Sequence, residues 1–62
     1  MKHICNAKFS GYNFGIAIDK SIDNPGLLRL IDETDGSEIG DAYESEAEAI
    51  DAIFVSWPDN DF

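Results

Sequence analysis

The sequence predicts one α+β domain, an antiparallel β-meander of three to four strands with a single C-terminal helix packed on one face. Apolar and polar residues alternate strictly over the first part of the chain, as in half-buried strands. Later, a helix-start signal precedes apolar residues at helical spacing. A chain of 62 residues, 44% of them hydrophobic, suits one domain with a thin core and little room for a deep cleft.

The alternation predicts a first hairpin with strands over residues 2–9 and 12–19. Ser10 and Gly11 lie between them, and this pair suits a two-residue turn because glycine readily adopts a positive φ. The resulting register gathers the large apolar residues on one face by pairing Phe9 with Tyr12, Ala7 with Phe14 and Cys5 with Ile16. A slip of one residue would expose this row, so we expect the register to be firm.

A third strand is predicted over residues 27–33, after a loop rich in Asp, Asn, Pro and Gly at residues 20–26. The strand is apolar on both faces, which indicates a central position or a helix lying over one face. A weaker fourth strand follows over residues 38–43. We expect Gly40 and Ala42 to form a shallow patch on which the helix can sit closely.

The turn between the third and fourth strands allows two registers. A two-residue turn at Asp35 and Gly36 sets Glu33 opposite Glu38, which places like charges together. A three-residue loop with Gly36 in the left-handed conformation of a bulge instead pairs Ile31 with Ile39 and Arg29 with Asp41. We expect the bulged register because it avoids the like-charge pair.

The helix is predicted over residues 45–57, with Pro58 ending it. Ser45 and Glu48 have the spacing of a capping box, in which the serine hydroxyl accepts from the Glu48 amide and the Glu48 carboxylate reaches back to the Ser45 amide. We expect the acidic tail over residues 58–62 to fray. The alternative is that Asp61 and Phe62 form a small hook. The helix face predicted to meet the sheet consists of Ala47, Ile50, Ile53, Phe54 and Trp57.

Charge is distributed unevenly along the chain. Eleven of the 13 acidic residues lie at or after position 32, whereas all four basic residues come earlier. Residues 1–31 therefore sum to +2 and residues 32–62 to −11. Solubility alone is served equally well by interspersed charges, and crowded like charges destabilise a fold. This separation indicates a surface that binds a basic partner.

Several other functions are disfavoured by the sequence. His3 and Cys5 are the single histidine and cysteine, and Cys5 belongs to the apolar row, so no nucleophilic system and no enzyme is expected. The acidic turn resembles an EF-hand loop, but with Gly36 at its sixth position the first and twelfth would be Ile31 and Ala42, which lack carboxylates. We therefore expect no metal and no cofactor. A single cysteine and the absence of a long apolar stretch predict a cytoplasmic protein without a membrane segment. Repulsion by phosphates opposes direct nucleic-acid binding.

The predicted partner-binding surface is a ladder of carboxylates running from the second hairpin onto the helix. Carboxylates at alternate strand positions stand about 7 Å apart, and those one helix turn apart about 5–6 Å. Such rows can present negative charge to Lys/Arg sites that normally contact phosphates. The ladder consists of Asp32, Glu33, Asp35, Glu38, Asp41, Glu44, Glu46, Glu48 and Asp51.

In its size, its acidity and its meander followed by a capped acidic helix at residues 44–50, the chain resembles small phage and mobile-element proteins, including anti-CRISPR inhibitors that act as DNA mimics. The resemblance is one of whole-chain character and carries no signature motif. It implies an inhibitor that occupies the DNA-binding surface of a CRISPR effector subunit.

The alternative hypothesis is a small protein–protein interaction module whose acidity serves only solubility. The Ser-x-x-Glu helix after a strand also resembles antitoxins of the HicB type. A monomer is the expected state. A homodimer would form along an edge strand or through an apolar patch on the uncovered sheet face, consisting of Leu27, Ile31, Ile39 and Tyr43.

Overall fold

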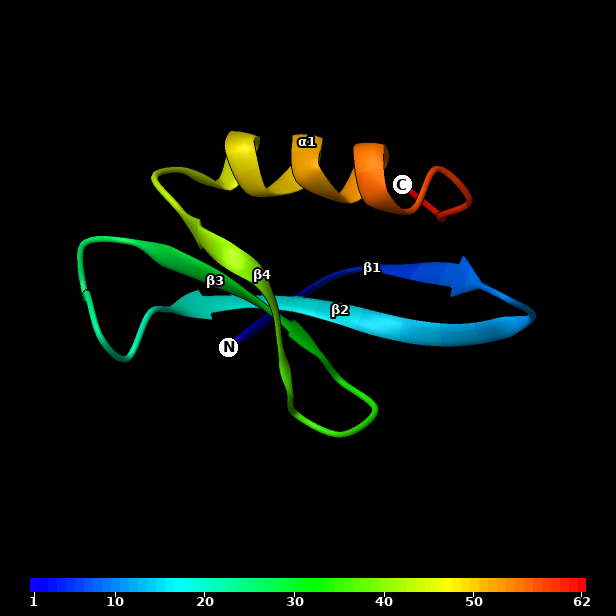
Figure 1. The fold of residues 1–62 in the computed structure, drawn as a ribbon, viewed down its shortest axis with the longest axis horizontal. Coiled ribbons are helices and arrows are strands. Elements are labelled where there is room, and N and C mark those ends of the chain that lie inside the picture. Colours follow the sequence, from blue (N-terminus) through cyan, green and yellow to red (C-terminus); the bar gives the residue numbers. More distant parts are fainter.

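The computed structural model describes residues 1–62 and contains a four-stranded antiparallel sheet with one helix lying over one of its faces (Figure 1). The strands follow one another in the sheet in chain order, so each pairs with the strand before it. This confirms the predicted α+β meander. The elements are β1 (Lys2–Phe9), β2 (Tyr12–Lys20), β3 (Leu28–Asp32), β4 (Glu38–Tyr43) and α1 (Glu46–Ser56).

The first hairpin has the predicted register, with Phe9 opposite Tyr12 at its tip. Ser10 and Gly11 form the two-residue turn with φ values of 51° and 83°, the pair of positive angles that matches the right-handed twist of the flanking strands. One irregularity was not predicted, a register shift between His3 and Cys5. It leaves Ile4 as an extra residue in β1, half-buried against the core.

The second hairpin adopts neither predicted register. Ile39 pairs with Leu30 rather than with Ile31, and Glu38 lies opposite Ile31. The loop is longer than expected, because the Asp32 amide donates to the Ser37 carbonyl at 2.9 Å and leaves four residues in the turn. Carboxylates stabilise this longer loop: Asp32 Oδ1 accepts from the Thr34 amide at 2.8 Å, and Asp35 Oδ1 from the Ser37 amide at 2.9 Å. Gly36 does take the expected positive φ, at 78°.

A second shift of register follows in β4. Leu28 pairs with Tyr43, so the segment around Gly40 holds more residues than the β3 segment it faces. Gly40 has a φ of 68°, a left-handed conformation that favours glycine. Gly40 and Ala42 are exposed and do not form the predicted seat for the helix. The shift instead directs the larger Tyr43 side chain against the core.

The core lies between the sheet and α1. Its buried members from the sheet and the helix are Cys5, Ala7, Ile16, Ile18, Leu30, Ala49 and Ile53. Ile39 and Tyr43 pack against it rather than lying on the uncovered face as predicted, because the register of β4 differs from the expected one. On the opposite face, Ala17 and Ile31 are only 1% and 4% exposed although no helix covers them.

The helix face that meets the sheet overlaps the predicted one but is rotated: Ile53 is buried and Trp57 packs against the core, as predicted, while other members differ. Ala49 and Ile53 are fully buried, whereas Ala47 is exposed and Phe54 is 46% exposed. Residue spacing alone allows both the predicted and the observed rotation of α1, because apolar residues also occur on either side of the predicted helix face. Ala49, whose small side chain suits a close contact between helix and sheet, is the buried alanine of the helix. The prediction had placed Ala47 in this role.

The C-terminal tail does not fray but pairs with β1. Asn60 forms an isolated antiparallel bridge with Ala7, and the Asp61 amide donates to the Asn6 carbonyl at 3.1 Å. The Asp61 carboxylate accepts from the backbone and side-chain amides of Asn6 at 2.6 and 2.8 Å, and the Phe62 ring lies 5.1 Å from that of Phe54. The tail therefore forms the small hook that was stated as the alternative to fraying. The hydrogen bonds that hold it cannot be recognised from the pattern of apolar residues.

Candidate partner-binding surface

The nine carboxylates of the predicted ladder all reach the surface, Asp32 as a half-buried residue and the others as exposed ones. The structure divides them into two groups at the two ends of β4, with Asp41 between them; Figure 1 shows β4 running from the turn after β3 toward the start of α1. The ends of β4 pair with Ile31 and Leu28, three positions apart in β3, so they lie roughly 10 Å apart. One group lies around the turn between β3 and β4, and the other at the start of α1.

Three members of the ladder contact basic side chains from the first half of the chain. Glu46 contacts Lys2 Nζ at 2.9 Å, Glu38 contacts Arg29 at 3.9 Å, and Glu33 contacts the His3 ring. The pairing of β3 with β4 brings Arg29 to Glu38, whereas Lys2 and His3 reach their partners from β1. The separation of charge along the sequence is therefore only partly a separation in space.

Arg29, His3 and their partners lie on the sheet face that α1 leaves open. Arg29 also contacts Asp19 at 3.6 Å, and its side chain is only 17% exposed. Glu33 extends over Gly15, where an added Cβ would meet its carboxylate oxygen at 3.0 Å. Ala17 lies between His3 and Ile31 in the register of this face, and long side chains such as these can shield small apolar neighbours from water.

Two ladder members at the turn act mainly on their own loop. Asp32 and Asp35 accept the backbone hydrogen bonds described above. The Ser37 hydroxyl, followed by the Ser37 amide, holds the pKa of Asp35 below its ordinary value. Both carboxylates lie at the turn between β3 and β4, apart from those near the start of α1.

The remaining four carboxylates, Asp41, Glu44, Glu48 and Asp51, form no ion pair; we call them the acidic row. Glu48 and Asp51 lie three residues apart on α1, so their Cβ atoms are about 5–6 Å apart. Glu44 precedes the N-cap Ser45, and Asp41 lies within β4. All four are exposed.

Local hydrogen bonds fix the start of this row. Ser45 Oγ accepts from the Glu48 amide at 3.2 Å, as the predicted capping box requires. The Glu48 carboxylate accepts from the Glu44 amide at 2.9 Å instead of the Ser45 amide. Glu46 and Glu48 lie in the first turn, where the helix dipole favours negative charge. The helix start therefore positions these carboxylates as well as tolerating their charge.

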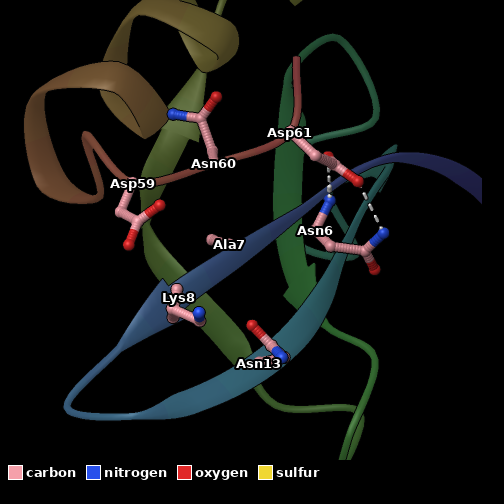
Figure 2. A pocket seen from close by; sticks show the side chains of 7 residues that line it. All are labelled: Asn6, Ala7, Lys8, Asn13, Asp59, Asn60 and Asp61. Carbon is pink, nitrogen blue, oxygen red and sulfur yellow. Dashed lines mark hydrogen bonds between the residues drawn. The ribbon is translucent and has the colours of Figure 1, made fainter.

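Sequence reasoning missed a shallow concavity of about 390 Å³ between the first hairpin and the tail (Figure 2). Its lining is almost entirely polar and consists of Asn6, Ala7, Lys8, Asn13, Asp59, Asn60 and Asp61. In Figure 2 the Asp61 carboxylate points to Asn6, which holds it through two hydrogen bonds. The Asn6 backbone amide, and then its side chain, lower the pKa of Asp61. Asn6 is one polar residue among several on its strand, so its pattern gave no signal for this partner.

Side chains that could bind a metal ion or act as a nucleophile do not come together in the structure. No three His, Cys, Asp or Glu side chains come together in a way that would hold a metal ion. Cys5 is 2% exposed, and burial, followed by the charges of Asp61 and Glu33, raises the pKa of its thiol. A buried protonated thiol is a poor nucleophile. No helix is long and apolar enough to cross a membrane.

The chain matches no family model, no curated protein and no solved structure. Its function is therefore inferred from the positions, charges and exposure of its own residues.

Proposed function

We propose that the protein is an inhibitor that binds a basic, DNA-binding surface of another protein through the acidic row, and that this partner is a CRISPR effector subunit. The observation that carries the proposal is the absence of any cation beside Asp41, Glu44, Glu48 and Asp51, although cations do pair with other carboxylates of the chain. Four exposed carboxylates without counter-charges raise the energy of the free protein through self-repulsion. A basic partner would relieve that repulsion.

The spacing of the row fits groups that normally hold phosphates. Glu48 and Asp51, about 5–6 Å apart on α1, can each accept hydrogen bonds from an arginine or lysine, and an arginine can engage one carboxylate through two parallel bonds. Phosphate contacts provide most of the affinity in sites that bind DNA without reading bases. A protein that occupies the same Lys/Arg groups therefore competes with DNA without resembling its bases.

The alternative, a homodimer through the uncovered sheet face, has no specific observation in its favour. Ile39 and Tyr43 belong to the core on the other face. Ile31 is 4% exposed beneath charged side chains. The four residues predicted to form one apolar patch are thus divided between the two faces of the sheet.

The test is affinity capture from a bacterial lysate that contains CRISPR effectors, with two variants of equal charge. The row variant carries Asp41→Asn, Glu44→Gln, Glu48→Gln and Asp51→Asn. The control carries Asp23→Asn, Glu33→Gln, Glu38→Gln and Glu46→Gln. Each loses four negative charges, from −9 to −5. Glutamine at position 48 preserves the capping box, and the exposed ion pairs lost in the control contribute little to stability.

We expect wild type and control to capture the same DNA-binding protein, and the row variant to capture little or none of it. Raised salt and competing duplex DNA should each release the captured protein, because the contact is electrostatic and shares the DNA site. Equal capture by both variants, or no DNA-binding protein in any capture, would contradict the proposal.

A further inference from the structure

A group of aromatic side chains lies at the free end of the first hairpin; we call Phe9, Tyr12, Phe14 and Trp57 the aromatic tip. Phe9 and Tyr12 are directly opposite each other, which brings their Cβ atoms to about 5 Å. Phe14 follows Tyr12 on the same strand face, and its ring centroid lies 5.6 Å from that of Trp57 in an edge-to-face contact. Phe14 and Trp57 are half-buried, and Phe9 and Tyr12 extend the same strand face beyond them.

The outer half of this surface is not covered by the fold. Phe9 and Tyr12 are 61% and 77% exposed, although they lie on the sheet face that α1 covers elsewhere. The cause is a difference in length: the 11 residues of α1 span about 16 Å, whereas the nine residues of β2 span about 30 Å. In Figure 1 the hairpin projects past the C-terminal end of the helix. Phe9 and Tyr12 are thus held opposite each other although most of each residue remains exposed to solvent.

Two negative features, the C-terminal end of α1 and Asp59, lie near the aromatic tip, and one cation, Lys8, precedes Phe9 in the chain. The helix ends at Trp57 with no basic residue in its last turn, so the partial negative charge of its last carbonyls has no cation beside it. Asp59 lies next to this end, with its carbonyl accepting from the Lys8 amide at 2.9 Å. Neither Lys8 nor Asp59 forms an ion pair. An occupant that combines apolar side chains with positive charge fits this end of the molecule.

We propose that the aromatic tip is a second contact site for the partner, binding a segment in which apolar side chains alternate with arginine or lysine. This inference rests on the proposed function for the sign of the partner's charge. Aromatic faces attract guanidinium groups and pack against their apolar stems. A second copy of the chain, or a nucleic acid, would bring further negative charge to a protein whose net charge is −9, so a basic protein segment is the occupant that electrostatics favours.

The test uses two synthetic peptides of six residues and equal charge: Arg-Leu-Arg-Arg-Leu-Arg, and the same peptide with serine in place of leucine. Each is titrated into the isotopically labelled full chain while amide and ring resonances are followed by NMR. The test variant carries Phe9→Ser and Tyr12→Ser. The control carries Ile22→Ser, which removes an equally exposed side chain, 76% exposed, from the loop between β2 and β3. The row variant is titrated as well.

We expect the leucine peptide to bind wild type about five-fold more tightly than the serine peptide and to shift the ring resonances of Tyr12 and Trp57. The double serine variant should lose this difference in affinity between the two peptides, and the control should keep it. The row variant should bind both peptides more weakly, by the same factor. Resonance shifts confined to the acidic row would contradict the proposed binding site at the aromatic tip and leave the proposed function standing. Shifts at the tip without shifts in the row would support the tip site and contradict the proposed function. No shifts at all would contradict both proposals.

Three further measurements address other occupants of the tip. Zwitterionic phosphatidylcholine vesicles and a single-stranded oligonucleotide should leave the Trp57 fluorescence unchanged. Sedimentation should show one mass over a wide range of protein concentration. A fluorescence change that the double serine variant abolishes, or a dimer that it abolishes, would assign the tip to lipid, nucleic acid or a second copy and overturn the inference.

Discussion

Replacing Ile53 tests the observed orientation of α1. Its side chain is fully buried, and removing such a side chain to alanine costs about 3 kcal/mol, from the transfer of the lost atoms and the cavity left behind. A domain of this length has a free energy of unfolding of about 3–9 kcal/mol. Ile53→Ala therefore removes a third or more of the total, and Ile53→Val removes about 1 kcal/mol.

Val55→Ala is the matched control, since it also replaces a β-branched helix residue but at a site that is 83% exposed. It should change stability by no more than about 0.5 kcal/mol. Urea unfolding followed by circular dichroism and by Trp57 fluorescence measures all three variants. With a slope of about 1 kcal/mol per molar urea, Ile53→Val should lower the midpoint by about 1 M and Ile53→Ala by about 3 M.

The result that would refute this reasoning is equal destabilisation by Ile53→Ala and Val55→Ala. It would mean that the helix presents another face to the sheet than the one observed. A loss at Phe54→Ala as large as that at Ile53→Ala would point to the face expected from residue spacing alone, which buries both residues.

Three further predictions concern the tail, β4 and the cysteine. Because hydrogen bonds from Asn6 lower the pKa of Asp61 in the folded chain, the stabilisation they give is present above the pKa of the unfolded aspartate and is lost as pH falls through the lower folded value; amide exchange at Asp61 should accelerate over that range, and Asp61→Ala should accelerate it at neutral pH. Gly40→Ala should cost about 1–2 kcal/mol in urea unfolding, because φ is 68° there, whereas Gly26→Ala, whose Cβ meets its nearest atom at 3.5 Å without a positive φ, should cost much less; equal costs would contradict the reasoning. A thiol reagent should label Cys5 in the native protein at least about 100-fold more slowly than in urea, since only opening of the fold exposes it.

The first hairpin was predictable because its evidence is local. Alternation assigned the two faces of β1 and β2, and a Ser-Gly pair between them defined a turn of known length. A wrong register would have exposed the whole apolar row. Sequence and energetics therefore allowed one solution there, and the structure adopts it.

The second hairpin was predicted wrongly because its loop length depends on polar contacts. The pattern weighed a like-charge pair against a bulge at Gly36, but the hydrogen bonds accepted by Asp32 and Asp35 select a loop of four residues. One shift there changed the face on which Ile39 lies. The predicted apolar patch on the open face disappeared for that reason alone.

The candidate surface was predictable in its residues but not in its pairing. Spacing placed Ser45 and Glu48 in a capping box and put Asp51 one turn later, as observed. It gave no sign that Lys2 would reach Glu46 or that Arg29 would reach Glu38, since such contacts join residues far apart in the chain. Of the nine carboxylates in the predicted ladder, three contact basic side chains and two lie at the turn between β3 and β4. Four carboxylates remain, and these form the acidic row.

The central claim is that the acidic row competes with DNA for a basic protein surface. The most direct measurement adds wild type, the row variant or the equally charged control to the captured DNA-binding protein bound to a fluorescently labelled DNA duplex, and follows anisotropy. We predict that wild type and control release the duplex at concentrations within about two-fold of each other, and that the row variant needs at least about ten-fold more. Release by the row variant at the control's concentration, or no release by wild type, would contradict the claim.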